Sequence, residues 1–346
     1  MININRMRDI AEAMYSRMVE TSHGERGTQA LRALLEFVPA FYKHVAPETR
    51  RTRILVLKHL NDVALGPLSD AVECASLGHM PVLSENEVVV QILRAGRFLL
   101  SQTAVIDPMQ VAQNCVVYAY ENRTEAFYAG SASSPVINPA EGYASIFAIP
   151  TFDDLKLALK EYRDKQARRT SCRILAEVWR TERRIIFRAG PESTMRNSLT
   201  QFLKACLRGD VEVRPEQIVD ETHPVDIKVT WFMSNRLALI EIKWLGASAK
   251  TAKTLVEYFD GRARKGAKQL ADYLDANARQ APRQESRGYL VLFDGRRGRV
   301  KPCTRTVNRA NGFKYEHSEI LFRPKYHEIR PDFEVPVRMF MEPVCD

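Results

Sequence analysis

The sequence predicts a mixed α/β protein in two parts: a mostly helical N-terminal region, then a domain built on a mixed β-sheet. A chain of 346 residues is long enough to form two separate hydrophobic cores. Apolar residues recur at helical intervals through much of the first half, as in 28–44. The second half contains two adjacent apolar strands, 225–232 and 237–244, with helical patterns on either side.

Residues 1–185 are expected to be mostly helical. Their role would be regulation, substrate binding, or contact with a partner subunit or a second copy of the chain. The segments with helical spacing are 5–20, 28–44, 51–64, 86–101 and 151–168. Residues 115–120 and 143–149 are instead expected to be strands around a loop rich in Gly, Ser, Asn and Pro.

The two strands of the second half carry charged residues at informative positions. Side chains alternate between the faces of a strand, so Asp226 points away from the face of Val225 and Ile227. Glu241 and Lys243 are two residues apart and share one face. A two-residue turn at 233–234 would place Asp226 opposite Glu241, and a four-residue loop at 233–236 would place it opposite Lys243. A three-residue loop would turn Asp226 to the wrong face.

Two carboxylates and an ammonium group fit metal-dependent hydrolysis of a phosphodiester. The charged oxygens of a phosphodiester repel hydroxide, and hard cations such as Mg²⁺ offset that charge, activate water and prefer carboxylate ligands. A lysine beside them stabilises the charge of the transition state or positions the attacking water. The pattern therefore predicts Asp226 and Glu241 as metal ligands and Lys243 as the catalytic cation.

The flanking segments add three further residues. A helix is expected over 190–207, with Pro191 in its first turn and Glu192 where the helix dipole favours an acid. A second helix is expected over 263–276, where Gln269 and Tyr273 lie four residues apart on one face. Residues 287–294 then form an apolar strand.

The order of these motifs resembles the PD-(D/E)XK nuclease superfamily, whose members share the restriction-endonuclease-like fold. Pro224-Val225-Asp226 stands for the P-D half with one residue inserted, and Glu241-Ile242-Lys243 for the (D/E)-x-K half. Gln269 to Tyr273 is similar to the Q-x-x-x-Y motif of the RecB-like and Cas4-like branch.

The resemblance implies a nuclease domain over 186–300, with 301–346 as an extension packed on its core. It implies cleavage of nucleic acid, most readily DNA, with Mg²⁺ or Mn²⁺, and it suits bacterial restriction or anti-phage defence. Glu192 and the backbone carbonyl of Ile242 would join Asp226 and Glu241 as metal ligands. Gln269 and Tyr273 would orient the site or the scissile strand. The alternative is a catalytically silent nuclease-fold subunit that binds nucleic acid or assembles a larger complex.

Charge agrees with a nucleic-acid partner. The chain carries a net charge of +9, and residues 262–305 hold 12 basic side chains against 4 acidic ones. Basic residues clustered around a helix suit a phosphate backbone. The residues expected to contact nucleic acid are Arg262, Arg264, Lys265, Lys268, Arg296, Arg297 and Arg299.

Composition indicates a cytoplasmic protein without a membrane span. No apolar run approaches the ~18 residues that a membrane helix needs, and the first residues lack a signal-peptide pattern. The six cysteines are far apart, with neither a disulfide framework nor zinc spacing. His223 adjoins Pro224, but a place in a surface loop is expected for it rather than contact with metal or substrate.

Overall fold

The computed structural model describes residues 4–68, 71–84, 86–138, 143–207, 209–218, 224–251 and 254–346, with backbone alone at 4–12, 217 and 218. His223 lies outside the described residues. The chain forms two compact units, Met1–Asp153 and Asp154–Asp346. The predicted α/β class is confirmed, because each unit combines helices with a mixed sheet. The division falls before the boundary expected at 185.

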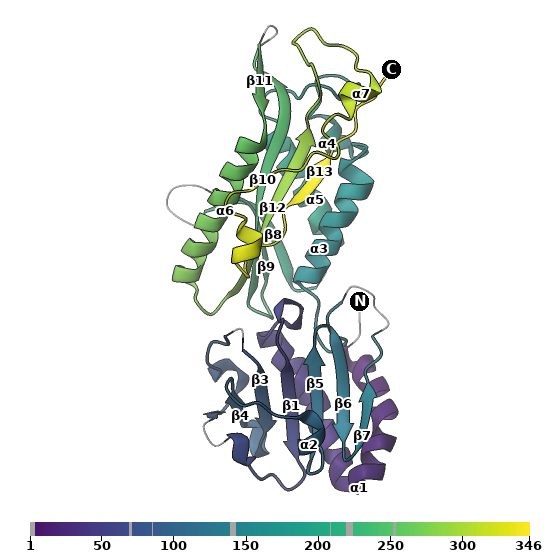
Figure 1. Ribbon diagram of the computed structural model, residues 1–346, viewed down its shortest axis with the longest axis vertical. Coiled ribbons are helices and arrows are strands. Elements are labelled where there is room, and N and C mark those ends of the chain that lie inside the picture. Colours follow the sequence, from purple (N-terminus) through teal and green to yellow (C-terminus); the bar gives the residue numbers. More distant parts are fainter. Residues whose placement is uncertain are drawn as a thin grey trace. The chain divides into compact units, whose positions relative to one another are not determined.

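The N-terminal unit is a seven-stranded sheet in the order β2-β4-β3-β1-β5-β6-β7, and α1 packs on it (Figure 1). Among the described strand pairs of this unit, β1–β3 is parallel and the others are antiparallel. The helices and strands are α1 (Ile4–His44), β1 (Ile54–His59), β2 (Val72–Cys74), β3 (Val88–Ile92), β4 (Phe98–Ser101), α2 (Pro108–Val111), β5 (Cys115–Glu121), β6 (Thr124–Ala129) and β7 (Ala132–Pro135).

Apolar clusters cover both faces of this sheet. Alternate residues of β1 divide between them: Ile54 and Val56 belong to the cluster that includes Leu31, Leu34 and Leu35 of α1, and Leu55 and Leu57 to the other. Gly24 interrupts α1 with a positive φ of 61°, so the predicted helices 5–20 and 28–44 form two halves of one kinked element.

The expectation of a mostly helical N-terminal region is wrong for its middle part. Residues 51–64 contain strand β1, and 86–101 contain strands β3 and β4. Runs such as Val88-Val89-Val90 are β-branched and fully buried, which suits a central strand better than a helix. The strand expected at 115–120 is β5, whereas 143–149 contain no strand.

The C-terminal unit is a six-stranded sheet in the order β13-β12-β10-β9-β8, with β11 paired to β10. The pairs β10–β12 and β12–β13 are parallel and the others antiparallel. Its elements are α3 (Phe152–Glu161), a π-helical turn (Tyr162–Ala167), α4 (Arg173–Ala176), α5 (Glu192–Cys206), β8 (Val211–Ile218), β9 (Pro224–Trp231), β10 (Arg236–Ala249), β11 (Leu255–Tyr258), α6 (Asp260–Gln280), β12 (Glu285–Gly295), α7 (Arg309–Gly312), α8 (Tyr326–Ile329) and β13 (Val337–Phe340).

Helices α6 and α5 lie on opposite sides of this sheet (Figure 1). Leu270 and Leu274 of α6 pack against Leu290 and Leu292 of β12. Phe293, on the other face of β12, meets Tyr162, which also stacks edge-on against Phe202 of α5. The tail joins the same sheet, because β13 pairs with β12.

Candidate functional site

Strands β9 and β10 bring the predicted acids together. The pairing runs from Trp231↔Arg236 to Ile227↔Ile240, around the loop 232–235. This is the register of a turn centred on 233–234, and the pairing ends there, one residue before Asp226 on β9 and Glu241 on β10. The side chains of Asp226, Glu241 and Lys243 are all buried, with 6%, 1% and 7% of each residue exposed.

Backbone pairing between β9 and β10 stops before Asp226, and the side chain of Asp226 accepts the next hydrogen bond from β10. Its Oδ2 accepts the backbone N–H of Ile242 at 2.8 Å, so a carboxylate replaces a backbone acceptor at this point. Its Oδ1 accepts from Nη1 of Arg196 on α5 at 2.9 Å, and the same guanidinium also binds Glu216 of β8. Both oxygens of Asp226 therefore have donors.

Only one of the two carboxylate oxygens of Glu241 accepts a hydrogen bond from a described residue. Its Oε1 accepts a close hydrogen bond from Nζ of Lys243. Its Oε2 is buried and has no hydrogen-bond partner among the described residues. An unpartnered buried carboxylate oxygen costs about 1–3 kcal/mol, and more when charged, which a ligand would relieve.

Gly266 of helix α6 packs against the side chain of Lys243. A Cβ atom at position 266 would lie 2.5 Å from Cγ and 3.2 Å from Cε of Lys243. Because glycine has no side chain, the aliphatic part of Lys243 has room to pass Gly266 and reach Glu241. The helix forms around this contact because Ala263, Ala267 and Leu270 bury one apolar stripe against the sheet.

Burial sets the ionisation of the two acids. It raises the pKa of Asp226, against the hydrogen bond from Ile242 and the charges of Lys243 and Arg196. It raises the pKa of Glu241 to about 8; Lys243 opposes the shift and the negative charge of Asp226 adds to it. Raised pKa values at two neighbouring buried carboxyls are typical of functional sites.

Glu192 lies in the first turn of α5, as predicted, but its partner is a residue expected to bind nucleic acid. Nη2 of Arg262 donates to Glu192 Oε2 at 2.5 Å. The same guanidinium stacks 4.2 Å from the ring centre of Tyr258 and 5.1 Å from that of Trp244. In this arrangement Arg262 braces the start of α6 against the start of α5.

Arg196 is a site residue that the sequence motifs do not include. It lies one helical turn after Glu192, on the same face of α5, and reaches Asp226 directly. That spacing is a usable signal, because a basic residue four positions after a candidate acid points into the same site.

Gln269 and Tyr273 lie together, as their spacing predicts. Gln269 Nε2 donates to the hydroxyl of Tyr273 at 2.6 Å, and that hydroxyl donates to the carbonyl of Pro224 at 3.1 Å. Pro224 is the first residue of β9, two before Asp226. The pair thus connects α6 to the strand that carries the first acid.

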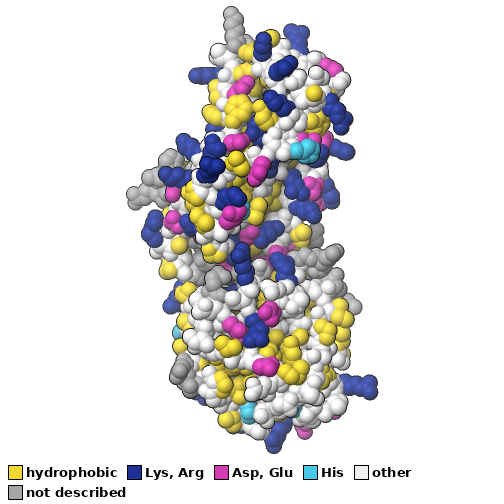
Figure 2. Space-filling view, viewed as in Figure 1, with side chains coloured by type: hydrophobic (Ala, Val, Ile, Leu, Met, Phe, Trp, Pro, Cys, Tyr) yellow, Lys and Arg dark blue, Asp and Glu magenta, His cyan; other side chains and the backbone are white. Residues whose placement is uncertain are grey.

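The predicted basic contacts divide into exposed and buried residues. Arg264, Lys265, Lys268 and Arg299 are exposed, and Lys and Arg side chains are spread over the visible face of the C-terminal unit (Figure 2). Arg296 and Arg297 are instead buried, with only 4% and 7% of each residue exposed.

The two buried arginines have structural partners. Arg296 pairs with Asp294 at 2.8 Å and with Asp260 at 2.6 Å. Arg297 donates to the backbone carbonyls of Arg184 and Met341, which fixes the tail. Neither guanidinium is available to a phosphate in this conformation.

The acids around Asp226 and Glu241 match the ligand preferences of a divalent cation only in part. Within the described ranges no group of three or more His, Cys, Asp and Glu side chains is arranged to hold a metal. The two acids on adjacent strands, with an unpartnered Oε2 on Glu241, nevertheless offer the hard oxygen ligands that Mg²⁺ and Mn²⁺ prefer. Glu192 would need to leave Arg262 to act as a third acid.

Comparisons with protein-family models, with curated proteins and with solved structures found no match to this chain. No helix in the described part is both long and apolar enough to cross a bilayer.

Proposed function

We propose that the C-terminal unit is a Mg²⁺- or Mn²⁺-dependent nuclease, with DNA as its preferred substrate. The observation that carries the proposal is the buried trio on β9 and β10: Asp226 close enough to Glu241 for its charge to raise the pKa of that acid, Lys243 bonded to Glu241, and one oxygen of Glu241 unpartnered. The order of motifs around it is that of PD-(D/E)XK nucleases, for which restriction or anti-phage defence is the biological setting that we infer.

Each residue has a distinct task in this proposal. Asp226 and Glu241 hold the cation, which when bound supplies charge neutralisation and an activated water. The backbone carbonyl of Ile242 is a further candidate ligand. Lys243 is buried beside Glu241, where a single positive charge acts strongly on a developing phosphorane.

Three residues prepare the site for cleavage without touching the reacting atoms. Tyr273 and Gln269 hold the start of β9 in place through Pro224. Arg196 neutralises Asp226 until a cation arrives. Exposed Arg264, Lys265 and Lys268 on α6 are the basic residues we assign to the nucleic-acid backbone.

The test is cleavage of linear, closed-circular and single-stranded DNA and of RNA by purified protein with Mn²⁺ or Mg²⁺, followed by calorimetric titration with Mn²⁺. Asp226→Ala should lose both cleavage and Mn²⁺ affinity. Lys243→Ala should lose cleavage by about 10²–10³ in rate but keep Mn²⁺ affinity. Binding of DNA should survive in both variants. Loss of linear DNA with persistence of circles would indicate an exonuclease.

A matched control separates chemistry from folding. Lys228→Ala removes a lysine from the same hairpin, on β9 opposite Leu239, and should leave cleavage unchanged. Wild-type cleavage by Asp226→Ala and Lys243→Ala alike would reject the nuclease proposal.

The second candidate is a binding or assembly subunit that does not cut. One observation favours it: both oxygens of Asp226 already accept hydrogen bonds, from Ile242 and Arg196, which leaves a cation only their remaining lone pairs. DNA binding without Mn²⁺ affinity in the wild-type protein would select this function.

A further inference from the structure

A second cavity in the C-terminal unit has the chemistry of an anion site. It lies between two loops, 180–186 and 301–305, and has a volume of about 690 Å³. That volume is in the range of small-ligand pockets, about 300–1,000 Å³. It shares no residue with the site of Asp226 and Glu241.

Basic and apolar side chains line this cavity together. Four of its lining residues are basic and none is acidic: Arg180, Arg183, Lys301 and Arg305. Ile185 and Ile186 are buried beneath it, where they pack with Val307. Guanidinium groups beside apolar side chains suit a ligand that carries both a phosphate and a flat ring.

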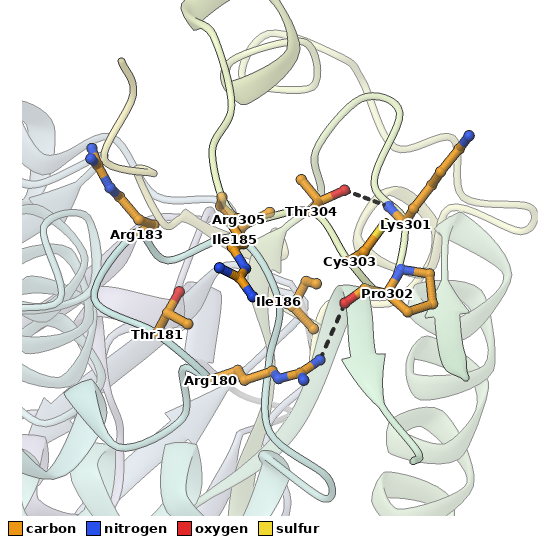
Figure 3. A pocket seen from close by; sticks show the side chains of 10 residues that line it. All are labelled: Arg180, Thr181, Arg183, Ile185, Ile186, Lys301, Pro302, Cys303, Thr304 and Arg305. Carbon is orange, nitrogen blue, oxygen red and sulfur yellow. Dashed lines mark hydrogen bonds between the residues drawn. The ribbon is translucent and has the colours of Figure 1, made fainter. Parts of the chain in front are cut away.

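Figure 3 shows where the basic side chains of the cavity point. Arg305 extends its guanidinium to the middle of the view, beside Ile186 and above Arg180, whereas Arg183 and Lys301 point their charged ends outward. Arg183 pairs with Asp346 at 3.3 Å. Among the described residues neither Arg180 nor Arg305 forms an ion pair with a carboxylate, so two central guanidinium groups lack an anion.

The walls of the cavity are held by their own hydrogen bonds. Arg180 Nη1 donates to the carbonyl of Pro302 at 3.3 Å and so links the two loops. Lys301 N–H donates to Thr304 Oγ1 at 2.8 Å, and Thr304 N–H returns to the carbonyl of Lys301 at 2.9 Å. A cavity with preformed walls loses little ordering entropy on binding.

We propose that this cavity binds the phosphate of a nucleotide, with Arg180 and Arg305 on the phosphate and the base over Ile185 and Ile186. Guanidinium groups match phosphate oxygens in pairs. The nucleotide is either free or part of a strand, because both present the same phosphate and ring. The proposal does not rest on nuclease activity.

The thiol of Cys303 lines the cavity and reports on its occupancy. Cys303 and Cys206 are the two exposed cysteines among the six, and Cys206 lies on α5 outside the cavity. The experiment measures alkylation rates of both by peptide mapping, in EDTA so that no metal-dependent cleavage consumes the probe. The probes are AMP, inorganic phosphate and a short oligonucleotide, each compared with NaCl at equal ionic strength.

The expected result is saturable protection of Cys303 alone. At ten times the dissociation constant, alkylation of Cys303 should slow by about tenfold while that of Cys206 stays constant. Protection by AMP identifies a free nucleotide as sufficient, and protection by the oligonucleotide alone identifies a strand phosphate. Inorganic phosphate tests whether the base contributes.

Arg305→Gln is the decisive variant, because it leaves the bond between Arg180 and Pro302 in place. The ratio of rates with and without probe should return to one in Arg305→Gln. It should stay as in wild type in Arg279→Gln, which removes an exposed arginine of α6 outside the cavity. No protection by any probe beyond that of NaCl, or equal protection in Arg305→Gln, would overturn the proposal.

Discussion

Gly266 packs directly against the side chain of Lys243 and leaves no room for a side chain of its own. A Cβ atom at position 266 would lie 2.5 Å from Lys243 Cγ. Cγ is near the backbone, and the backbone of Lys243 is fixed by pairing with Leu292 of β12. The lysine stem therefore has little freedom to move aside. The position of the Lys243 ammonium group therefore depends on the absence of a side chain at Gly266.

Replacing that glycine should damage the site despite favouring the helix. Gly266→Ala gains about 1 kcal/mol in helix propensity, but overpacking costs about 1–3 kcal/mol. We expect a net loss of unfolding free energy and a fall in cleavage of about tenfold or more, with Mn²⁺ affinity retained. Urea unfolding, cleavage rate and calorimetry measure the three quantities.

Gly261→Ala is the matched control in the same helix. The nearest atom to its added methyl group is Arg264 Nη2 at 4.0 Å, so no clash arises. Stability and cleavage should equal or exceed those of wild type. Equal behaviour of the two alanine variants would show that Gly266 does not position Lys243.

Removing Arg196 should make stability depend on metal. Asp226 is buried, and a buried charge that loses its partner costs about 3–5 kcal/mol. Arg196→Met should therefore unfold at lower temperature in EDTA, and Mn²⁺ should raise its melting temperature more than that of wild type. An equal Mn²⁺-induced shift in both proteins would place the cation away from Asp226.

Metal binding should release a proton at neutral pH. The pKa of Glu241 is raised to about 8, so the metal-free carboxyl holds a proton at pH 7, and a cation ligand has to lose it. Mn²⁺ affinity should rise by up to about tenfold per pH unit from pH 6 and level off above about pH 8. Calorimetry in buffers of different ionisation enthalpy measures the proton released, and pH-independent affinity would contradict the expectation.

The elements of the candidate site are predictable because their signals are local. The alternation in 225–232 predicts strand β9, and the spacing of Met195, Leu199 and Leu203 predicts α5. The turn geometry leaves two registers open for Asp226, and only strand pairing selects between them. The position of the acids within their elements is thus easier to predict than their contacts.

The errors arise where distant residues decide the outcome. The run Ile54–Leu57 fits a short buried strand as well as a helix, and only pairing with β3 and β5 distinguishes them. The charge of Arg296 suggests a phosphate contact, but its partner Asp260 is 36 residues away in the chain. Composition identifies a basic segment, but it does not show which of its arginine and lysine side chains form ion pairs within the protein.

Gln269 and Tyr273 should act as one unit. Tyr273→Phe removes the bonds to Gln269 and to the carbonyl of Pro224, and each of these bonds is worth about 0.5–1.5 kcal/mol. Gln269→Leu removes only the first. In a double-mutant cycle the losses of cleavage rate should be less than additive, with Tyr273→Phe alone nearly as slow as the double variant. Full additivity would mean that the two residues contact the substrate separately.

The salt dependence of DNA binding should separate exposed from buried arginines. Neutralising Arg264, Lys265 and Lys268 to Gln should reduce the slope of log K against log salt by about 0.9 for each phosphate that the protein no longer neutralises. Arg296→Gln should leave the slope unchanged and lower the unfolding free energy, because it breaks ion pairs to Asp294 and Asp260 in a buried position. Fluorescence anisotropy at several salt concentrations, together with urea unfolding, tests both halves. A slope that falls in Arg296→Gln, with stability unchanged, would return Arg296 to the nucleic-acid interface and contradict its assignment as a structural residue.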